Sequence, residues 1–239
     1  MALSLNAADG ADEDLMKRLL SLVETDKGGR LKIPPERVAA ERLNVQRAKI
    51  REILLALEQF GFIERVQGSG TFLTVPQPYF MQVYFEIAMQ LKYISFDSIE
   101  KTREMLELAI VEEAALRATD DDVTELWRLC DIITASANAE HKIDADLEFH
   151  RLLATMTRNS AIMVLFQSIS SVLGDVVRQR RMLVHDNEHS FEAINNNHIA
   201  IVEAVEKRDP ELARKAMAAH FNIWEQQYHL TLFSPAFRK

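Results

Sequence analysis

The chain has 239 residues, of which 48% are hydrophobic and 27% charged, with 7 Gly and 6 Pro. This length and composition fit one large or two ordinary folded domains and exclude collagen-like, low-complexity and disordered chains. The net charge of −8 argues against a protein that is cationic over its whole surface.

The distribution of charge and the cysteine content narrow the class of protein further. Residues 1–76 carry 11 basic and 11 acidic side chains, so the whole excess of acid lies in residues 77–239. Within the first part, residues 28–66 hold 8 basic and 5 acidic side chains. A locally basic segment on an acidic body favours a small polyanion-binding module joined to a domain with another task. The single cysteine, Cys130, excludes an internal disulfide framework. No apolar run reaches the ~20 residues of a membrane span and no signal peptide is evident, so we expect a cytoplasmic protein with no membrane partner.

Three short helices are predicted in the first 60 residues. The first contains apolar positions from Leu15 onward and is expected to end at the glycine pair 28–29. A second helix can begin at the proline pair after Ile33, where proline is tolerated, and runs to about Arg42. A third helix is predicted over 45–60, with an apolar stripe opposite a polar face.

A β-hairpin is predicted directly after these helices. The β-prone runs 62–66 and 71–75 are joined by the glycine-rich segment 67–70. Three short helices followed by a hairpin outline a winged helix-turn-helix, which is a DNA-binding shape. Pro76 and Pro78 mark a linker, so the sequence predicts a winged helix-turn-helix domain over residues 1–76 and a second domain over residues 77–239.

Beyond the linker the strand signals end and long amphipathic segments follow. Asp97, Thr119 and the pair Asp209-Pro210 have the chemistry of helix starts. We therefore predict a mainly α protein whose second domain is an all-helical antiparallel bundle. Its expected helices cover 79–93, 97–118, 120–139, 141–157, 160–183, 188–208 and 209–230.

The polar face of the third helix carries residue types that read DNA. Arg47 and Arg51 are four residues apart and share one face, with Gln46 and Lys49 beside it. Arginine suits guanine and phosphate, and glutamine can pair with adenine. Arg37, near the start of the second helix, can reach a backbone phosphate. Three arginines on short helices also fit a solvated surface, and it is the helix-turn-helix layout that favours DNA contacts.

Residues 33–74 resemble the N-terminal pattern of the GntR family of bacterial transcription regulators, with the sequence IPPERVAAERLNVQRAKIREILLALEQFGFIERVQGSGTFLT. The resemblance implies that Arg37, Arg47 and Arg51 contact DNA. It also implies that Gly70 lies at a wing tip that approaches the minor groove. Where the family usually has Ser before the arginine of its recognition helix, this chain has Gln46.

Polar residues also interrupt the apolar stripes of three helices in the second domain. His198 and His220 each lie on an otherwise apolar stripe, and Asp146 and His150 stand four apart on one helix face. One carboxylate and three imidazoles suit Zn²⁺, Ni²⁺ or Mn²⁺ and leave coordination positions open. A lone histidine on such a stripe is more often a hydrogen-bonded core residue, so the metal hypothesis depends on convergence of all four.

The predicted helix at 97–118 carries two charges within its apolar run. Arg103 and Glu107 lie one turn apart on the same inward face. A buried pair of this kind is a structural clamp in one interpretation, because buried charges are normally paired. In the other interpretation Arg103 offers its guanidinium to a ligand carboxylate while Glu107 holds it in place.

Residues 97–230 resemble the FCD effector domain of the FadR-type GntR regulators, with the signatures TREMLE, DLEFH, NNHIAIVEAVEKRD and AAHF in order. The resemblance implies that Asp146, His150, His198 and His220 are the metal ligands and that Arg103 borders the effector pocket. The family often has an acidic residue before the third ligand, where this chain has Asn197.

These features predict a transcription regulator, expected to act as a repressor. It would bind a pseudo-palindromic double-stranded DNA operator as a homodimer and respond to a small organic acid at a divalent metal site. One alternative is a metal-dependent hydrolase or lyase with an attached DNA-binding module. The chain offers no general base outside the ligand set, no Ser-His-Asp arrangement and no glycine-rich phosphate loop, so we expect no enzyme. Another alternative is an architectural DNA-binding protein with a structural metal, which would leave Arg103 without a purpose.

Overall fold

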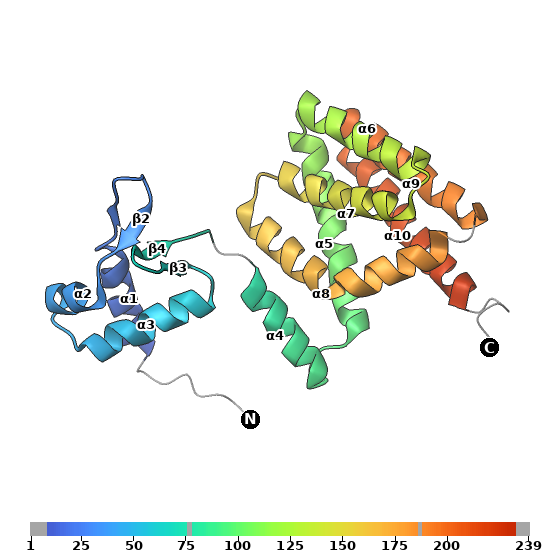
Figure 1. Cartoon of the computed structure of the whole chain (residues 1–239). Helices are drawn as coiled ribbons and strands as arrows, with labels where there is room; N and C mark the ends of the chain where they lie inside the picture. Colours follow the sequence, from blue (N-terminus) through green and yellow to red (C-terminus); the bar gives the residue numbers. More distant parts are fainter. Residues whose placement is uncertain (1–8, 76–77, 186–187, 233–239) are drawn as a thin grey trace. The chain divides into compact units, whose positions relative to one another are not determined.

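The computed structural model describes residues 9–75, 78–185 and 188–232 (Figure 1). The chain divides into two compact units, residues 1–81 and 82–239. Ten helices and one small antiparallel sheet make up the described chain, so the predicted mainly α fold is confirmed. The domain boundary expected after residue 76 lies at residues 76–77, outside the described residues, and stays a prediction.

The N-terminal unit combines three short helices with the sheet. Leu19, Ile33, Ile50 and Leu54 are at most 1% exposed and form the centre of its core. The strand order is β1-β2-β4-β3, with every neighbouring pair antiparallel, and the winged helix-turn-helix is confirmed. The helices are α1 (Asp9–Leu20), α2 (Glu36–Leu43) and α3 (Arg47–Gln59). The strands are β1 (Glu24–Thr25), β2 (Leu31–Ile33), β3 (Ile63–Val66) and β4 (Gly70–Leu73).

The first helix is shorter than the sequence predicts. It ends at Leu20, and the glycine pair at 28–29 belongs to the turn between β1 and β2 instead. The Asp26 carboxylate shapes this turn, because its Oδ1 accepts hydrogen bonds from the backbone N–H groups of Gly28 at 2.8 Å and Arg30 at 2.9 Å. Gly29 supplies the positive φ of 81° that the turn requires. The expected helix end at 28–29 is therefore wrong.

A tight turn connects α2 to α3. Asn44 ends α2 in a left-handed conformation with φ 54°, and Gln46 precedes α3 with an extended backbone. Ile50, Leu54 and Leu57 are buried along one side of α3. The helix therefore presents its polar side outward, as its periodicity predicts.

The strands β3 and β4 form the predicted hairpin. Ile63 pairs with Leu73 and Val66 pairs with Gly70, so the turn covers residues 67–69. Gly68 and Gly70 have φ of 76° and 125°, which L-residues rarely adopt. Because β4 also pairs with β2, the wing is a continuation of the sheet rather than a separate arm.

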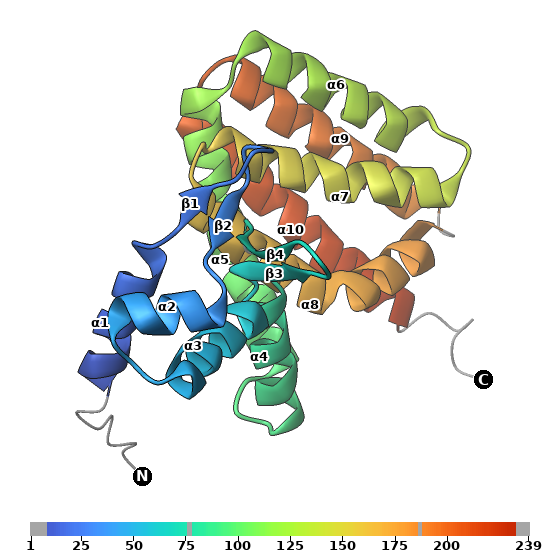
Figure 2. The ribbon, with the colours of Figure 1, turned by 60° about the vertical axis from the view of Figure 1, so that its left-hand side comes forward.

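The chain described beyond residue 78 holds helices and no strand, which confirms the predicted helical domain. α10 packs against α9 and α5, and α6 lies beside α7 and α9 in both ribbon views (Figures 1 and 2). None of the described helices is long and apolar enough to cross a membrane. The helices are α4 (Tyr79–Gln90), α5 (Phe96–Arg117), α6 (Asp120–Ala135), α7 (Ala139–Met156), α8 (Ser160–His185), α9 (Glu188–Glu206) and α10 (Pro210–Leu232).

Local capping sets several of these helix starts. Thr119 caps α6 in a reciprocal capping box with Asp122, and Asp209 accepts a hydrogen bond from the N–H of Leu212 at 2.9 Å. Both starts agree with the sequence. α5 differs, because its N-cap is Ser95, which accepts from Ser98 N–H at 3.1 Å, and Asp97 lies inside the first turn.

Candidate metal centre and nucleic-acid interface

The outward side of α3 displays the residues expected to read DNA. The side chains of Arg47 and Arg51 are 61% and 53% exposed. Lys49 lies within 3.1 Å of Glu52 on the same helix, and Gln46 occupies the N-cap position. The structure therefore places four predicted DNA contacts on or directly before the first turns of one short helix.

An open hollow of about 810 Å³ lies where α2 meets the start of α3. Arg37 is on its rim and forms an ion pair of 2.7 Å with Glu41. Three of its lining residues, Arg37, Arg47 and Lys49, are basic and one, Glu41, is acidic, so this concave surface can take an anionic group. The lining residues are Arg37, Ala40, Glu41, Asn44, Val45, Gln46, Arg47 and Lys49.

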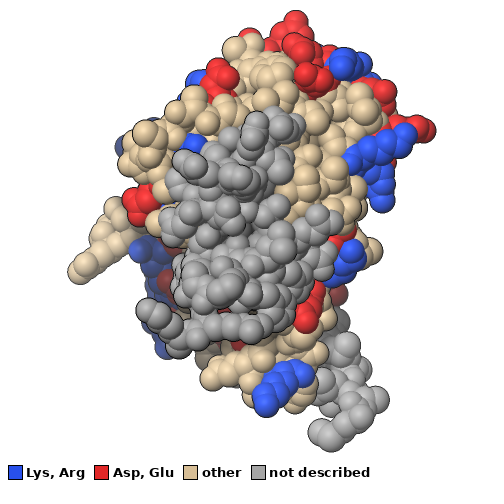
Figure 3. All heavy atoms as spheres, turned by 90° about the vertical axis from the view of Figure 1, so that its right-hand side faces the viewer, with Lys and Arg blue, Asp and Glu red and all other residues tan. Residues whose placement is uncertain are grey.

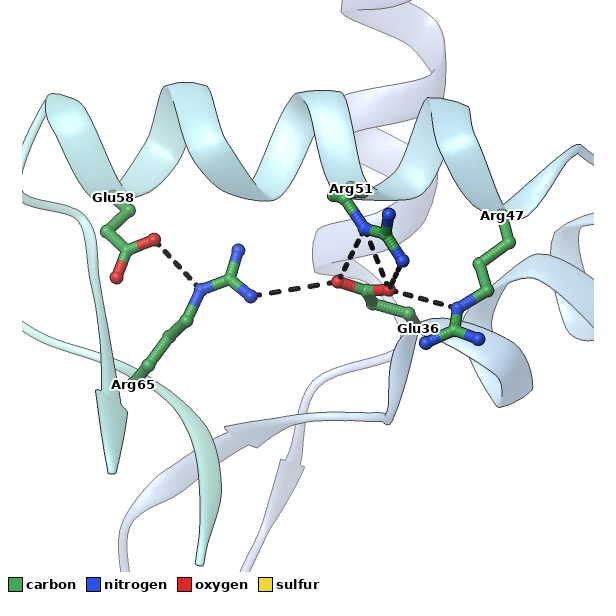
Figure 4. Close-up of polar contacts among 5 residues, drawn as sticks. All are labelled: Glu36, Arg47, Arg51, Glu58 and Arg65. Atoms are coloured by element: carbon green, nitrogen blue, oxygen red, sulfur yellow. Dashed lines mark hydrogen bonds and ion pairs between the residues drawn. The ribbon is translucent and has the colours of Figure 1, made fainter. Parts of the chain in front are cut away.

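One carboxylate links the arginines of this face (Figure 4). Glu36, the first residue of α2, has a side chain only 14% exposed. Its Oε2 accepts from Arg47 Nε at 3.0 Å and from Arg51 Nη2 at 3.1 Å, and its Oε1 lies 3.7 Å from Arg65 Nη1. Arg65, on the wing strand β3, also donates to Glu58 at 2.8 Å. The hydrogen bond from Arg51 lowers the pKa of Glu36 against the opposing effect of burial, so Glu36 is ionised at neutral pH.

The wing brings further basic side chains close to Gly70. A Cβ at Gly70 would lie 2.6 Å from Cε of Lys32, so only glycine fits beside the present position of that side chain. Arg30 stacks on the Phe72 ring, with its Cζ 3.8 Å from the ring centroid. Lys32 on β2 and Arg30 directly before it therefore add cations beside the wing that the sequence did not single out.

The charge distribution on the helical unit is different. On the face shown in Figure 3, the described part is mostly uncharged, and both Lys or Arg and Asp or Glu side chains are scattered over it. Mixed charges of this kind do not produce a surface of one sign.

The four residues expected to bind metal come together inside the helical unit. Asp146 and His150 project from α7, His198 from α9 and His220 from α10. One potential ligand atom from each lies within 4.8 Å of the others. All four residues are at most 4% exposed. Spacing alone predicted only the direction of each side chain, and helix packing produces the convergence.

Contacts within the cluster show how tightly the side chains are grouped. His198 Nε2 lies 2.8 Å from Asp146 Oδ1, and His150 Nε2 lies 3.9 Å from the same oxygen. The ring centroids of His198 and His220 are 4.6 Å apart. Two imidazole nitrogens therefore face one buried carboxylate oxygen.

Glu107 connects this cluster to Arg103. Its carboxylate is 1% exposed, accepts from Arg103 Nε at 2.5 Å and contacts His150 Nδ1. Burial acts to raise the pKa of Glu107, but the Arg103 charge and the hydrogen bonds with His150 and Arg103 outweigh it and lower the pKa to about 2. Arg103 is itself 8% exposed, and its Cζ lies 5.9 Å from the Phe221 ring centroid. The predicted inward pair is real, and its link to His150 is a contact that the sequence did not reveal.

The cluster has the donor chemistry of a divalent metal site. Because Glu107 engages Nδ1 of His150, Nε2 of that ring faces the other three residues. His150 Nε2 is buried and finds no hydrogen-bond partner in the described parts of the chain. Three imidazoles and one carboxylate fit Zn²⁺, Ni²⁺ or Mn²⁺, and a bound ion would satisfy that nitrogen.

Sequence reasoning missed two residues of the DNA face and one contact at the metal centre. Glu36 and Arg65 join the reading helix to the wing, and Glu107 joins Arg103 to His150. Glu36 had one available signal, because it is a carboxylate at the first position of a helix that starts after two prolines. No periodicity relates the other contacts, which connect separate elements.

Known proteins share both parts of this architecture. Residues 98–222 match the FCD domain, which is more than half of the chain. The chain is 32% identical to the HTH-type transcriptional repressor NanR of Cronobacter sakazakii over 202 residues, which cover 80% of this chain and 74% of that protein. It is 28% identical over 192 residues to the Exu regulon transcriptional regulator of Escherichia coli, covering 79% of this chain and 72% of that protein. The solved structure of Streptococcus agalactiae GntR covers 90% of this chain and 99% of its own, with a TM-score of 0.65 and 26% identity.

Proposed function

Because this chain belongs to the GntR family of transcription regulators with an FCD domain, we propose that a small carboxylate bound in its helical unit controls the affinity of its N-terminal unit for a DNA operator. The observation that carries this proposal is the buried Asp-His cluster linked through Glu107 to Arg103. The relatives are named as regulators or repressors, so the chain is a regulator and not a hydrolase or lyase.

We assign the two tasks to the two domains expected from the sequence. Residues 1–76 bind the operator, and residues 77–239 bind the effector and pair the chains. The operator contacts are residues of α2, α3 and the wing: Arg37, Gln46, Arg47, Lys49, Arg51 and Gly70. Their support is the exposed arginine pair on α3 and the hollow beside it.

Asp146, His150, His198 and His220 are the proposed ligands of one divalent ion. When bound, the ion supplies a positive charge and open coordination positions for an anion. The protein orients the site through Glu107, which holds His150 with Nε2 directed at the cluster. The surrounding apolar side chains exclude water, which strengthens electrostatic contacts to a bound acid.

The effector in this proposal is a small organic acid. Arg103 reaches Glu107 through Nε, and a guanidinium has further N–H donors with which it can hold a carboxylate. The acid bridges Arg103 and the metal site, and its binding alters how the DNA-reading units are held. An architectural protein with a structural metal would show no such response.

We also propose a homodimer on a pseudo-palindromic operator. A winged helix reads a short half-site, and two copies related by a two-fold axis supply the missing specificity. Bacterial operators lie in the cytoplasm, where we expect this regulator to act as a repressor, in line with the name of its relative in Cronobacter sakazakii.

One experiment tests the proposal directly. The full-length metal-loaded protein is incubated with a library of random duplexes, and bound DNA is amplified over several rounds. We expect a pseudo-palindromic consensus whose affinity changes with one class among hydroxy, keto, dicarboxylic and sugar acids. Enrichment of no sequence would contradict the DNA-binding proposal, and a consensus insensitive to every acid would contradict the effector proposal.

A further inference from the structure

Glu36 lies where the reading helix and the wing meet. Its carboxylate binds two arginines of α3 and lies 3.7 Å from a third arginine on β3 (Figure 4). The group is 14% exposed, whereas the side chains of Arg47, Arg51 and Arg65 are 61%, 53% and 37% exposed. A largely covered anion thus holds three cations that remain open to solvent.

This arrangement restricts the orientation of the arginine side chains but leaves some of their N–H donors available. Arg47 donates to Glu36 through Nε, so its two terminal nitrogens stay outside this hydrogen bond. Arg51 donates through both Nε and Nη2, which fixes the plane of its guanidinium against the carboxylate. A guanidinium held in one orientation loses less rotamer freedom when it meets a base edge.

The same carboxylate opposes contacts that carry no sequence information. Non-specific binding comes almost entirely from cations neutralising phosphates. The Glu36 carboxylate partly neutralises the positive charge of every arginine that it holds. The carboxylate itself also repels a nearby phosphate. A correct base edge offers a fixed guanidinium good hydrogen bonds, but a phosphate at the wrong register must compete with Glu36.

We propose that Glu36 is a specificity-determining residue of the DNA interface, which orients Arg47 and Arg51 for base contacts and weakens binding to non-operator DNA. The inference rests on the proposed DNA-binding function. It assigns a role in DNA recognition to a residue whose own negative charge repels the DNA backbone. Glu36 remains ionised at neutral pH because hydrogen bonds from Arg51 lower its pKa.

Glu36→Gln tests this inference because it keeps the shape of the side chain and removes its charge. Two duplexes are compared: the consensus enriched by the wild-type protein and a scrambled duplex of the same composition. We expect affinity for the scrambled duplex to rise and its dependence on salt to steepen by about 0.9 for each arginine released to a phosphate. Loss of one oriented base contact is expected to lower the ratio of consensus to scrambled affinity by about fivefold or more.

Glu58→Gln is the matched control. Glu58 is also on α3 and also accepts from an arginine, but in the described part of the chain that arginine is Arg65 of β3. The substitution removes the same charge from the same unit and leaves both arginines of α3 bound to Glu36. We expect it to raise affinity for both duplexes together and to keep their ratio within about twofold of wild type.

A measurement on the free protein separates orientation from net charge. Arginine Nε–H signals in NMR spectra report whether a guanidinium is fixed. In Glu36→Gln we expect the signals of Arg47 and Arg51 to move toward the position of free arginine, while Glu58→Gln shifts that of Arg65.

Three results would overturn the inference. They are an unchanged affinity ratio in Glu36→Gln, an equal loss of ratio in both variants, and unmoved Nε–H signals of Arg47 and Arg51. Thermal unfolding of each variant shows whether the N-terminal unit is intact. If the wild-type protein enriches no consensus, the proposed DNA-binding function fails and the inference fails with it, whereas a wild-type consensus with an unaffected Glu36→Gln refutes the inference alone.

Discussion

The side chains of the candidate metal centre differ in how far the sequence predicts them. Asp146 and His150 are one turn apart on α7, so their proximity is a local property of a helix. His198 and His220 are predicted to point inward, but their meeting depends on the packing of α9 and α10. The contact of Glu107 with His150 joins positions 43 residues apart, and no sequence period relates them.

Removal of single histidines tests the proposed ligand set. We expect His198→Ala and His220→Ala to lose the metal, because each removes one of four donors within 4.8 Å. Elemental mass spectrometry of the purified protein measures occupancy. His141→Ala is the control, since His141 is exposed near the start of α7. Full occupancy in both variants would identify the two residues as ordinary core histidines.

Glu107→Gln tests the link between the metal centre and Arg103. The substitution leaves the Arg103 guanidinium, which is 8% exposed, without its ionised partner. We expect unfolding free energy to fall by about 3 kcal/mol, measured by urea unfolding with a chelator present. Glu104→Gln on the same helix, whose partner is the exposed Lys101, is expected to change it by less than about 1 kcal/mol. Equal effects of the two substitutions would show that the buried pair has no special role.

At the scale of whole elements, the sequence predicts helix starts that depend on neighbouring residues. It does not predict strands that form by pairing with another segment. The starts of α6 and α10 were predictable because each depends on a few neighbouring residues. These are the capping box of Thr119 and the pair Asp209-Pro210. β1 has two residues and pairs only with β2, so it leaves no periodic pattern. The sequence consequently extends the first helix through a segment that forms a strand and a turn.

The helix α3, which we propose reads the operator, is the element whose function is most directly testable. We expect Arg47→Ala and Arg51→Ala each to cost about 1–3 kcal/mol of operator discrimination, because both side chains are on the exposed side of α3. Gel shifts against consensus and scrambled duplexes measure this loss. Lys17→Ala in α1, where Lys17 pairs with Glu13, serves as the control and is expected to leave discrimination unchanged. Wild-type discrimination in both arginine variants would refute the assignment of α3.

For the whole molecule, the first expectation is two-fold symmetry. One winged helix contacts too few base pairs to select an operator, so we expect two chains on a pseudo-palindromic site. Light scattering at micromolar concentration, with and without the enriched duplex, measures the number of chains. A single chain per particle under both conditions would contradict the dimer, and a consensus without internal symmetry would do so independently.

Communication between the two units needs a ligand that distinguishes two states of the protein. An acid changes operator affinity only by the difference between its affinities for the DNA-competent and incompetent states, typically ~1–3 kcal/mol. In the described part of the chain, polar contacts run from Arg103 through Glu107 to His150, one of the candidate metal ligands. Arg103 and Glu107 belong to α5 and His150 belongs to α7, so these contacts join two helices of the unit.

Substitution of Arg103 tests this path at the scale where it acts. We expect Arg103→Ala to keep metal and DNA binding but to lose the operator response to the effective acid, because the guanidinium that holds the carboxylate is gone. Arg103→Lys retains a charge beside Glu107 but lacks the planar fork, so we expect a weakened response in a well-folded protein. Arg117→Ala, an exposed change on the same helix, controls for altered charge. Calorimetry measures acid binding and gel shift measures operator release. A response in Arg103→Ala as strong as in the wild type would place acid recognition elsewhere in the helical unit.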